Sequence, residues 1–232
     1  MAEIQIGVDT GGTFTDFVIF RAGKISAKKI PSTPGNPSLA ILEGVREFLE
    51  PNARLMIIHG TTVATNVLLE RKGARIALIT TKGFEDILFI GRQTRSNLYS
   101  LKGERRNFIV DPRLCFGLDE RTSSAGLVEK PVSARDIRTV LQKIKARGAE
   151  AVAVCLINSY ANPAHENAVF KELQKQKILA SASSHILPEY REYERTSTTA
   201  ANAYLMPILH RYLGHLETKL QRAELKIMQS NE

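Results

Sequence analysis

The segment from residue 9 to residue 16 combines the residue types that bind a phosphate group. It reads Asp9-Thr10-Gly11-Gly12-Thr13-Phe14-Thr15-Asp16. The paired glycines allow the backbone to approach an anion closely, and the backbone amides and threonine hydroxyls can donate hydrogen bonds to it. A carboxylate at the end of a strand can hold hydrated Mg²⁺, and Asp9 and Asp16 are the candidates for that role.

The same segment also suits an ordinary tight hairpin, in which the turn needs glycine for positive φ. Three threonine hydroxyls exceed what such a turn requires, and we therefore favour a phosphate-binding turn. A Walker-type nucleotide site is excluded, because no Gly-x-x-x-x-Gly-Lys-Ser/Thr pattern occurs in the chain.

A second candidate, His59-Gly60-Thr61-Thr62, falls where a predicted strand meets the following helix. Open α/β sheets place ligands at such junctions. These residues alone favour plain N-capping by the two threonines, and binding of phosphate or substrate at the helix N-terminus is the functional alternative. His59 is a candidate acid, base or metal ligand, but a single histidine at a strand end is commonly only hydrogen-bonded structure. Asn66 lies one turn further along and faces either the same cleft or solvent.

Two arginines are weaker candidates for contacts with an anionic substrate. Arg92 follows a short predicted helix in an irregular segment, where solvation at the surface is the alternative. Arg195 precedes four consecutive hydroxyl residues, which suit the first turn of a helix and could form a second polar wall of the cleft. His210 and His215 are five residues apart on a predicted helix, so they point to different faces and do not suit a metal pair.

The elements that position these residues follow the order β-β-β-α-β-α-β through residue 80. Hydrophobic periodicity and turn residues predict strands over 4–8, 14–20 and 24–30, a helix after Asn36-Pro37, a strand over 55–59, a helix over 61–72 closed by Gly73, and a strand over 75–80. Three meandering strands followed by two right-handed crossovers predict a mixed sheet with helices on its faces. By analogy of topology, this order matches the ribonuclease-H-like half of the actin, sugar-kinase and Hsp70 ATPases.

A small additional α/β unit is predicted after residue 131, following a loop-rich stretch over 83–131. Ser133 is a plausible N-cap for a helix over 134–147, residues 151–158 form an almost wholly apolar strand, and a helix over 163–176 precedes a strand near 178–183. A short helix over 85–89 and strands near 107–119 come before it. Residues 190–223 read as helical, with Pro207 expected to kink or split the helix, and residues 225–229 begin a strand.

Composition indicates a folded chain without a membrane span. The 232 residues are 43% hydrophobic and 24% charged, which excludes wholesale disorder. The longest apolar run, residues 151–157, is too short to cross a bilayer, and the N-terminus lacks a signal sequence, so we expect a cytoplasmic protein. Cys115 and Cys155 lie far apart among apolar neighbours, and we interpret both as buried thiols without a metal role.

The net charge of +8 makes an anionic partner possible. The chain has no Trp and only 6% aromatic residues, so it supplies little of the stacking platform that single-stranded nucleic acid needs. We therefore expect a phosphorylated small molecule and no nucleic acid.

Several blocks of the chain, taken together, resemble the N-terminal region of the hydantoinase A/oxoprolinase family. They are Gly7–Asp16, His59–Asn66 with Leu68–Gly73, Gly83–Asp86, Ile90–Gln93, and Tyr193–Thr199 with Asn202–Leu205. The resemblance implies an actin-like ATPase fold, ATP and Mg²⁺ as cofactors, and a cyclic amide or imide substrate of the hydantoin or 5-oxoproline type. It also implies an oligomer with a second subunit of the hydantoinase B type.

The resemblance further predicts a division of the chain after residue 182. Residues 1–182 correspond to the N-terminal domain, and residues 183–232 to a helical segment and first strand of the following region, which looks truncated because family members are much longer. A subunit of an ATP-dependent ketone carboxylase is an alternative function within the family. A non-catalytic module that docks onto a second subunit is an alternative outside catalysis.

Overall fold

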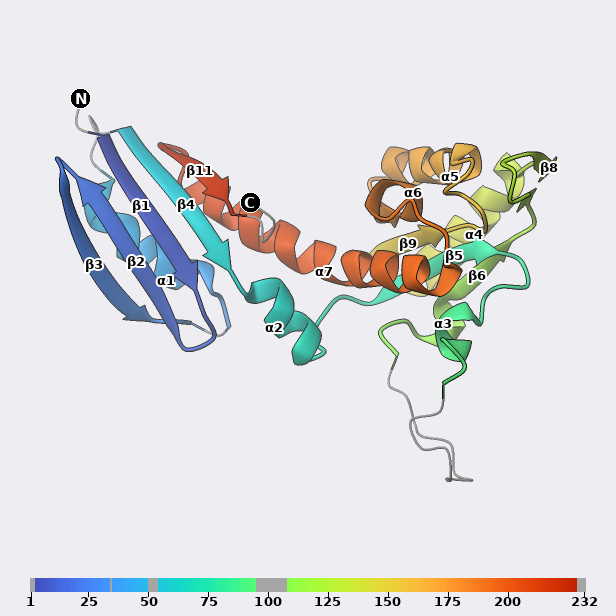
Figure 1. The fold of residues 1–232 in the computed structure, drawn as a ribbon, viewed down its shortest axis with the longest axis horizontal. Helices are drawn as coiled ribbons and strands as arrows, with labels where there is room; N and C mark the ends of the chain where they lie inside the picture. The colour runs from blue at the N-terminus through green and yellow to red at the C-terminus, as the bar shows by residue number, and fades with distance from the viewer. Residues whose placement is uncertain (1–2, 34, 50–53, 95–107, 229–232) are drawn as a thin grey trace, which may run out of the picture. The chain divides into compact units, whose positions relative to one another are not determined.

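The computed structural model describes residues 3–33, 35–49, 54–94 and 108–228 (Figure 1). The chain divides into two compact units. Unit 1 comprises the described residues of Met1–Lys72 and Ile208–Glu232, and unit 2 comprises those of Gly73–Pro207. The division after residue 182 that we predict concerns regions shared with relatives, and it stays a prediction.

Unit 1 is built on a five-stranded mixed sheet. The strands β1 (Glu3–Thr10), β2 (Phe14–Arg21) and β3 (Lys24–Pro31) form the predicted antiparallel meander, and β4 (Arg54–Thr61) and β11 (Ala223–Ile227) pair in parallel. The strand order is β11-β4-β1-β2-β3 (Figure 1). The last described strand of the chain thus completes the sheet that begins with the first.

The predicted second crossover strand does not join this sheet. Strand β5 (Ile76–Thr81) lies in the sheet of unit 2. In the sheet of unit 1, β11 occupies the position that we predict for β5. All six residues of β5 are buried, so the strand needs cover on both faces, whereas β11 leaves alternate residues exposed and suits a sheet edge. The order of elements predicted through residue 80 is confirmed, but the pairing of the last strand is wrong.

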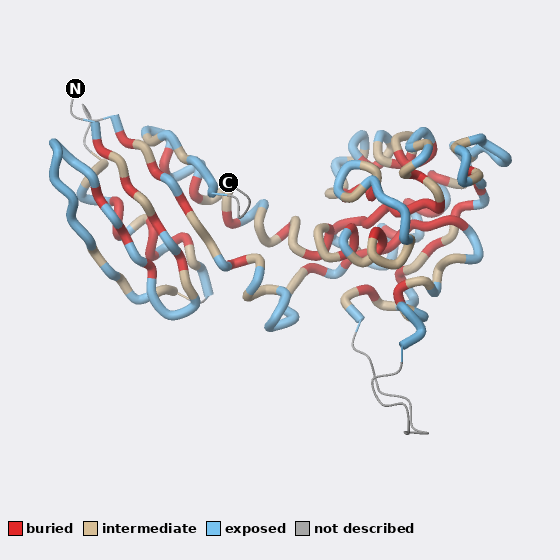
Figure 2. The backbone as a smooth tube through the Cα atoms, in the orientation of Figure 1, coloured by how far each residue is buried: buried red, intermediate tan, exposed pale blue. Residues whose placement is uncertain are grey.

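One face of the unit 1 sheet carries its core. Alternate residues of β1, β2 and β4 are buried, which gives the striped pattern of Figure 2. They pack against α1 (Ser38–Val45) and the C-terminal half of α7 (Glu192–Lys219), with Ile41, Val45, Leu216 and Leu220 fully buried. Helix α1 begins one residue later than predicted, with Asn36 Oδ1 accepting from the Ser38 amide at 3.3 Å. A short 3-10 turn, η1 (Arg46–Phe48), follows it.

Helix α2 (Val63–Leu69) connects β4 to unit 2 and is shorter than predicted. Gly73 does not close it, because the left-handed residue after the helix is Arg71, with φ of 55°. A Cβ on Gly73 would lie 2.0 Å from the ring of Tyr204, so this glycine makes room for an aromatic side chain.

Unit 2 is built on a four-stranded parallel sheet in the order β10-β9-β5-β6. Its other strands are β6 (Cys115–Leu118), β9 (Ala151–Cys155) and β10 (Leu179–Ala182). Helices α4 (Ala134–Ala146) and α5 (Ala164–Lys175) pack on the sheet, and Ser133 caps α4 as predicted by accepting from the amides of Arg135 and Asp136. The minor elements are α3 (Ile87–Ile90), η2 (Pro112–Leu114), β7 (Arg121–Thr122), β8 (Val128–Lys130) and α6 (Ser183–Ile186).

Helix α7 runs for 28 residues through both units, and the boundary between them falls at Pro207. The proline does not split the helix, contrary to one of the predicted outcomes. None of the helices in the described part of the chain combines the length and the hydropathy needed to span a bilayer.

The sheet of unit 1 is mixed as predicted, with β11 in place of β5. Three antiparallel strands are followed by two parallel ones, α1 lies between β3 and β4, and α2 begins the connection that returns to the sheet at β11. This mixed α/β architecture is that of the first lobe of actin-like ATPases. Unit 2 enters the chain between α2 and the C-terminal half of α7.

Candidate functional site

A pocket of about 240 Å³ lies within unit 1 beside the turn that joins β1 to β2. The turn contributes Thr10, Gly11 and Gly12, the segment after β3 contributes Ser32 and Thr33, and α2 contributes Asn66. Lys72 and Glu70, which form an ion pair at 2.7 Å, complete the polar lining. Hydroxyl, amide and ammonium groups therefore converge where the sequence predicts a phosphate-binding turn.

The turn is closed by the Gly11 amide, which donates to the Phe14 carbonyl oxygen at 3.0 Å. Ser32 supports it from the neighbouring strand, because its hydroxyl donates to the Gly11 carbonyl at 2.9 Å and lies 3.0 Å from Thr15 Oγ1. Thr15 is fully buried and does not line the pocket, so its hydroxyl supports the turn. This position does not suit the contact with a cofactor that the sequence predicts for Thr15. Thr13, also in the turn, is exposed.

The Thr10 hydroxyl is the unusual group of this pocket. Its Oγ1 is buried and forms no hydrogen bond of normal geometry, although the residue lines the pocket. A buried polar atom without a partner costs free energy comparable to a lost hydrogen bond. A ligand that bonds Thr10 would remove that cost, which indicates a binding site.

Glycine at position 12 leaves the approach to the pocket open. A Cβ there would lie 3.6 Å from Asn66 Nδ2, across the space between the turn and α2. The backbone amides, the hydroxyls and the Asn66 side-chain amide suit the oxygens of a phosphate group. The residues present therefore fit the phosphates of ATP.

Asp9 and Asp16 face each other across β1 and β2, on the opposite face of the sheet from Thr10 and Thr15. Asp16 forms an ion pair with Lys29 Nζ at 3.1 Å, whereas Asp9 forms no hydrogen bond or ion pair with any described residue. Neither carboxylate lines the pocket. The two aspartates predicted to hold a metal thus lie together, but beside the pocket rather than inside it.

This pair of carboxylates fits Mg²⁺, which is usually bound by one or two carboxylates together with waters and substrate phosphates. The described residues hold no group of three histidine, cysteine or acidic side chains that would form a metal cage. Asp9, which is exposed and has no ion-pair partner among the described residues, is the better placed of the two.

The segment after His59 joins the ends of β1 and β4. Thr62 donates its hydroxyl to the Thr10 carbonyl oxygen at 3.1 Å, and Thr61 Oγ1 accepts from the Val63 amide at 3.1 Å. Thr61 thus resembles a helix cap, whereas Thr62, the N-cap residue of α2, makes no side-chain bond to a helix amide. Neither threonine lines the pocket. Gly60 lies beside Asp9, whose Oδ1 would be 3.7 Å from a Cβ at position 60.

His59 is fully buried and lines neither of the two pockets found in unit 1. Its Nε2 lies 2.6 Å from the Tyr212 hydroxyl, and its Nδ1 lies 3.4 Å from the Val8 carbonyl oxygen. Burial lowers the pKa of the ring, so His59 is neutral at pH 7. This position does not suit the direct catalytic role predicted from the sequence, because the ring has no exposed surface.

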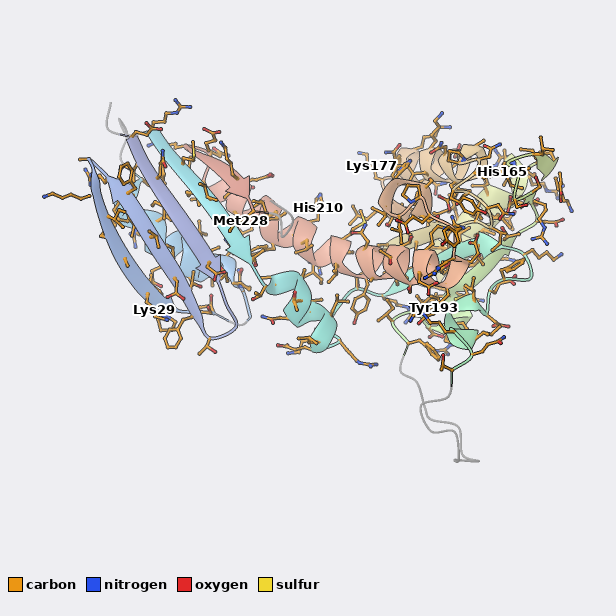
Figure 3. The ribbon with its side chains drawn as sticks, in the orientation of Figure 1. Lys29, His165, Lys177, Tyr193, His210 and Met228 are labelled. Carbon is orange, nitrogen blue, oxygen red and sulfur yellow. The ribbon has the colours of Figure 1, made fainter. Side chains whose placement is uncertain are left out.

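Arg92 belongs to unit 2 and does not line the pocket of unit 1. Its Nε donates to Glu194 Oε1 at 2.8 Å, and with Thr94, Tyr193 and Ser197 it lines an open hollow of about 400 Å³. Tyr193 is labelled in Figure 3 at the start of α7. Arg92 can still contact an anion there.

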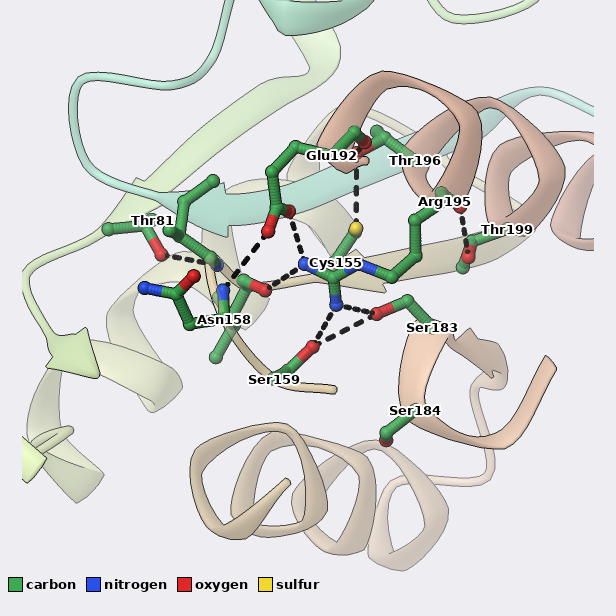
Figure 4. Close-up of polar contacts among 12 residues, drawn as sticks. Thr81, Cys155, Asn158, Ser159, Ser183, Ser184, Glu192, Arg195, Thr196 and Thr199 are labelled. Carbon is green, nitrogen blue, oxygen red and sulfur yellow. Dashed lines mark hydrogen bonds and ion pairs between the residues drawn. The ribbon is translucent and has the colours of Figure 1, made fainter. Parts of the chain in front are cut away.

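Arg195 has no exposed surface, and its position argues against the predicted contact with a substrate. Figure 4 shows its guanidinium bonded to Ser159, Ser183 and Glu192, and it also donates to the Leu156 carbonyl oxygen at 2.8 Å. Four hydroxyl residues after Arg195 lie within α7, where they bond mainly to carbonyls of the preceding turn. The arginine therefore ties α7 to the loop after β9.

The two cysteines differ in exposure. Cys155 is fully buried as predicted, whereas Cys115 is only partly buried. Burial raises the pKa of each thiol to about 12. Both thiols are therefore protonated at neutral pH and are poor nucleophiles.

Five polar residues of the site were not predicted from the sequence. Ser32, Thr33, Glu70 and Lys72 line the pocket, and Tyr212 bonds His59. Ser32 follows Pro31 just after a predicted strand, and serine at such a position is also common in ordinary loops. Tyr212 lies on the apolar face of a predicted helix, so its hydroxyl was the only signal of a polar contact.

The chain is similar to known proteins in both sequence and structure. The family model described as "Hydantoinase/oxoprolinase N-terminal region" matches residues 5–177. The crystal structure of the ATP-dependent caprolactamase from Pseudomonas jessenii superimposes with a TM-score of 0.84 at 30% identity, covering 98% of this chain and 36% of that one. The acetophenone carboxylase gamma subunit of Aromatoleum aromaticum is 36% identical over 94% of this chain and 33% of its own length.

A third relative, 5-oxoprolinase 1 of Arabidopsis thaliana, is 33% identical over 99% of this chain and 21% of its own length. The fold and the matches define an α/β protein of the actin-like ATPase type. The chain belongs to the hydantoinase/oxoprolinase family. It spans about a third or less of the length of these relatives.

Proposed function

We propose that this chain is the N-terminal part of an ATP-dependent enzyme that opens a cyclic amide or imide. The observation that carries the proposal is the polar pocket at the turn between β1 and β2, with the unpaired Thr10 hydroxyl in its wall. Relatives named for ATP-dependent lactam opening and for oxoproline hydrolysis support it.

In this proposal the turn residues Gly11, Gly12 and Thr13 hold the terminal phosphate of ATP, together with Asn66. Asp9 holds Mg²⁺ from the other face of the sheet, with Asp16 beside it. Lys72 adds a positive charge at the edge of the pocket. Gly60, Thr61 and Thr62 keep the ends of β1 and β4 together.

A five-membered lactam resists hydrolysis because its nitrogen donates electron density into the carbonyl group. ATP, when bound, supplies a phosphoryl group that activates the amide oxygen, after which water can attack the carbon. The residues of this chain contribute by binding and orienting the phosphate against the amide. The chain spans about a third or less of the length of its relatives, so activity is proposed only for the longer enzyme.

The proposal is tested by measuring the melting temperature of the chain with and without MgATP. Ligand binding stabilises a folded protein by about 2.7 kcal/mol at a concentration one hundred times the Kd, so a competent pocket gives a clear rise. Asp9→Asn should reduce the rise only when Mg²⁺ is present, and Asn66→Leu should reduce it with or without Mg²⁺. Arg92→Met, in unit 2, is the control and should leave it unchanged.

A ketone carboxylase subunit is a second candidate, because one relative at 36% identity is an acetophenone carboxylase subunit. ATP consumption by the full-length enzyme, measured with hydantoin, 5-oxoproline, or a ketone plus bicarbonate, separates the two reactions. A non-catalytic assembly module would show no nucleotide-dependent rise in melting temperature.

We also propose that the protein works in the cytoplasm as an oligomer with a second subunit of the hydantoinase B type. Two relatives are themselves named as subunits, caprolactamase subunit alpha and the acetophenone carboxylase gamma subunit. Co-purification with the product of the adjacent reading frame would test the partner.

A further inference from the structure

The second pocket of unit 1 lies next to the phosphate pocket and has a different lining. It is a hollow of about 350 Å³, and it shares Pro37 and Val63 with the pocket at the turn. Its polar groups come from the segment before α1 and from α7, and they are Asn36, Arg211, Tyr212 and His215. The described residues that line it include no acidic side chain, so Arg211 makes the pocket positive.

Hydrogen bonds at the start of α1 fix the direction of the contact with His215. The amide nitrogen and the hydroxyl oxygen of Ser38 lie 3.3 Å and 2.5 Å from Asn36 Oδ1, an oxygen that can only accept. Ser38 therefore gives its one hydroxyl proton to Asn36. His215 Nδ1, which is 2.6 Å from the same hydroxyl oxygen, must then donate to it. Ser38 has no exposed surface, so it holds the ring from within the fold.

The contact with Ser38 leaves Nε2 as the ring nitrogen for a ligand. Nε2 forms no hydrogen bond with any described residue, and the His215 ring lines the second pocket. Because Nδ1 carries a proton, Nε2 accepts in the neutral ring and donates in the charged ring. Tyr212, the remaining titratable group in the described lining, is uncharged at neutral pH because burial raises its pKa.

The charges around His215 favour an anion beside it. Arg211 and Lys219 lie four residues to either side of His215 on α7, and so on the same face of the helix. Two cations at these positions disfavour a second proton on the ring. A bound anion reverses this effect, so its binding and the protonation of Nε2 should support each other.

We propose that the second pocket is an oxyanion site, in which Arg211 and the charged His215 ring bind a carboxylate or a phosphate group. The guanidinium offers N–H donors in a fork that fits either group, and the Nε2–H group adds one more donor. Ser38 is a positioning residue, because it acts through the ring. Since this pocket borders the phosphate pocket, its anion belongs to a ligand bound beside the turn.

Sulfate is the probe for this site, because its charge is the same at about pH 6 and at about pH 8. Titration calorimetry of the 232-residue chain should show binding at least about tenfold weaker in Arg211→Met and in His215→Phe, since each variant loses a charged hydrogen bond. The wild-type Kd should rise by about tenfold between these pH values, because histidine loses its charge in this range, and His215→Phe should not show the rise. Absent sulfate binding at the lower pH, equal binding to wild type and both variants, or a wild-type Kd independent of pH would overturn the inference.

Arg222→Met and His210→Phe are the matched controls, because both residues are exposed in unit 1 and neither lines the pocket. They should leave the Kd for sulfate unchanged, and an equal loss in them would overturn the inference, because it would trace the effect to net charge or stability. Nitrogen NMR of the ligand-free chain at about pH 8 should show His215 protonated at Nδ1. Protonation at Nε2 instead would overturn the direction of the Ser38 contact.

Competition with sulfate identifies the source of the oxyanion. 5-Oxoproline and 2-pyrrolidone share a lactam ring, but only the first carries a carboxylate. Displacement of sulfate by 5-oxoproline and not by 2-pyrrolidone indicates a carboxylate, and displacement by inorganic phosphate alone indicates a phosphate group. Displacement by 2-pyrrolidone would overturn the inference, because the site would not select for charge. If the chain fails to bind MgATP, the proposed function fails, and the sulfate titrations still decide this site.

Discussion

Replacing Gly12 by alanine should separate the binding role of the turn from its role in the fold. The added methyl would lie 3.6 Å from Asn66 Nδ2, an ordinary contact, and the backbone at this position is not left-handed. The substitution therefore strains nothing, and it reduces the freedom of the unfolded chain. We expect the free energy of unfolding to stay the same or to rise by about 0.4–1 kcal/mol.

The affinity for MgATP should fall, although the stability of the fold does not. The methyl occupies the space between the turn and α2, and it keeps a phosphate oxygen away from the backbone amides. Losing one hydrogen bond to a charged group costs about 1.5–3 kcal/mol. Since each 1.4 kcal/mol is tenfold in affinity, the Kd for MgATP should rise by about 10- to 100-fold.

Titration calorimetry gives the Kd, and urea unfolding gives the stability of the same preparation. Gly214→Ala is the control, because a Cβ at that position of α7 meets nothing within 4 Å. It should stabilise the helix by about 1 kcal/mol and leave the Kd unchanged. Wild-type affinity in Gly12→Ala would refute the idea that the phosphate approaches the turn here, and a clear loss of stability would refute the described geometry.

Two further predictions concern stability. Arg195→Met removes a fully buried partner of Glu192 and should lower the free energy of unfolding in urea by about 3–5 kcal/mol, whereas Arg92→Met at an exposed ion pair should cost less than about 1 kcal/mol. Burial lowers the pKa of His59 below its usual 6.5, so the unfolded chain binds more protons below that pH and stability falls on acidification. His59→Gln should flatten this dependence, with His210→Gln, at an exposed position of α7 (Figure 3), as the control, and equal slopes would contradict it.

Local features of the fold were predictable because neighbouring residues determine them. The hairpin around the paired glycines follows from alternation and turn residues, and Ser133 caps α4 because its hydroxyl reaches two amides of its own helix. The sheet that β5 joins was not predictable in this way. Strands β4 and β11 pair although more than 160 residues separate them in sequence, and no local pattern specifies that pairing.

The candidate site was predictable to a similar degree. The turn residues and Asn66 come together because the ends of β1 and β4 are neighbours in a sheet of the predicted kind. The contact with a substrate predicted for Arg195 was wrong, because a charged side chain is usually exposed at the surface. Only the tertiary structure reveals the serines and glutamates that bury this arginine.

The alternation of side chains along β1 explains why Asp9 and Thr10 have different surroundings. Consecutive residues of a strand point to opposite faces, so Thr10 is buried against the helices while Asp9 is exposed on the other face. Both faces come within reach of one ligand only where the sheet ends, which is at the turn formed by Gly11 and Gly12. A phosphate at this turn could therefore contact a metal held by Asp9 on one side and groups in the pocket on the other. The binding function therefore lies in the turn itself, and glycine at position 12 is its most sensitive point.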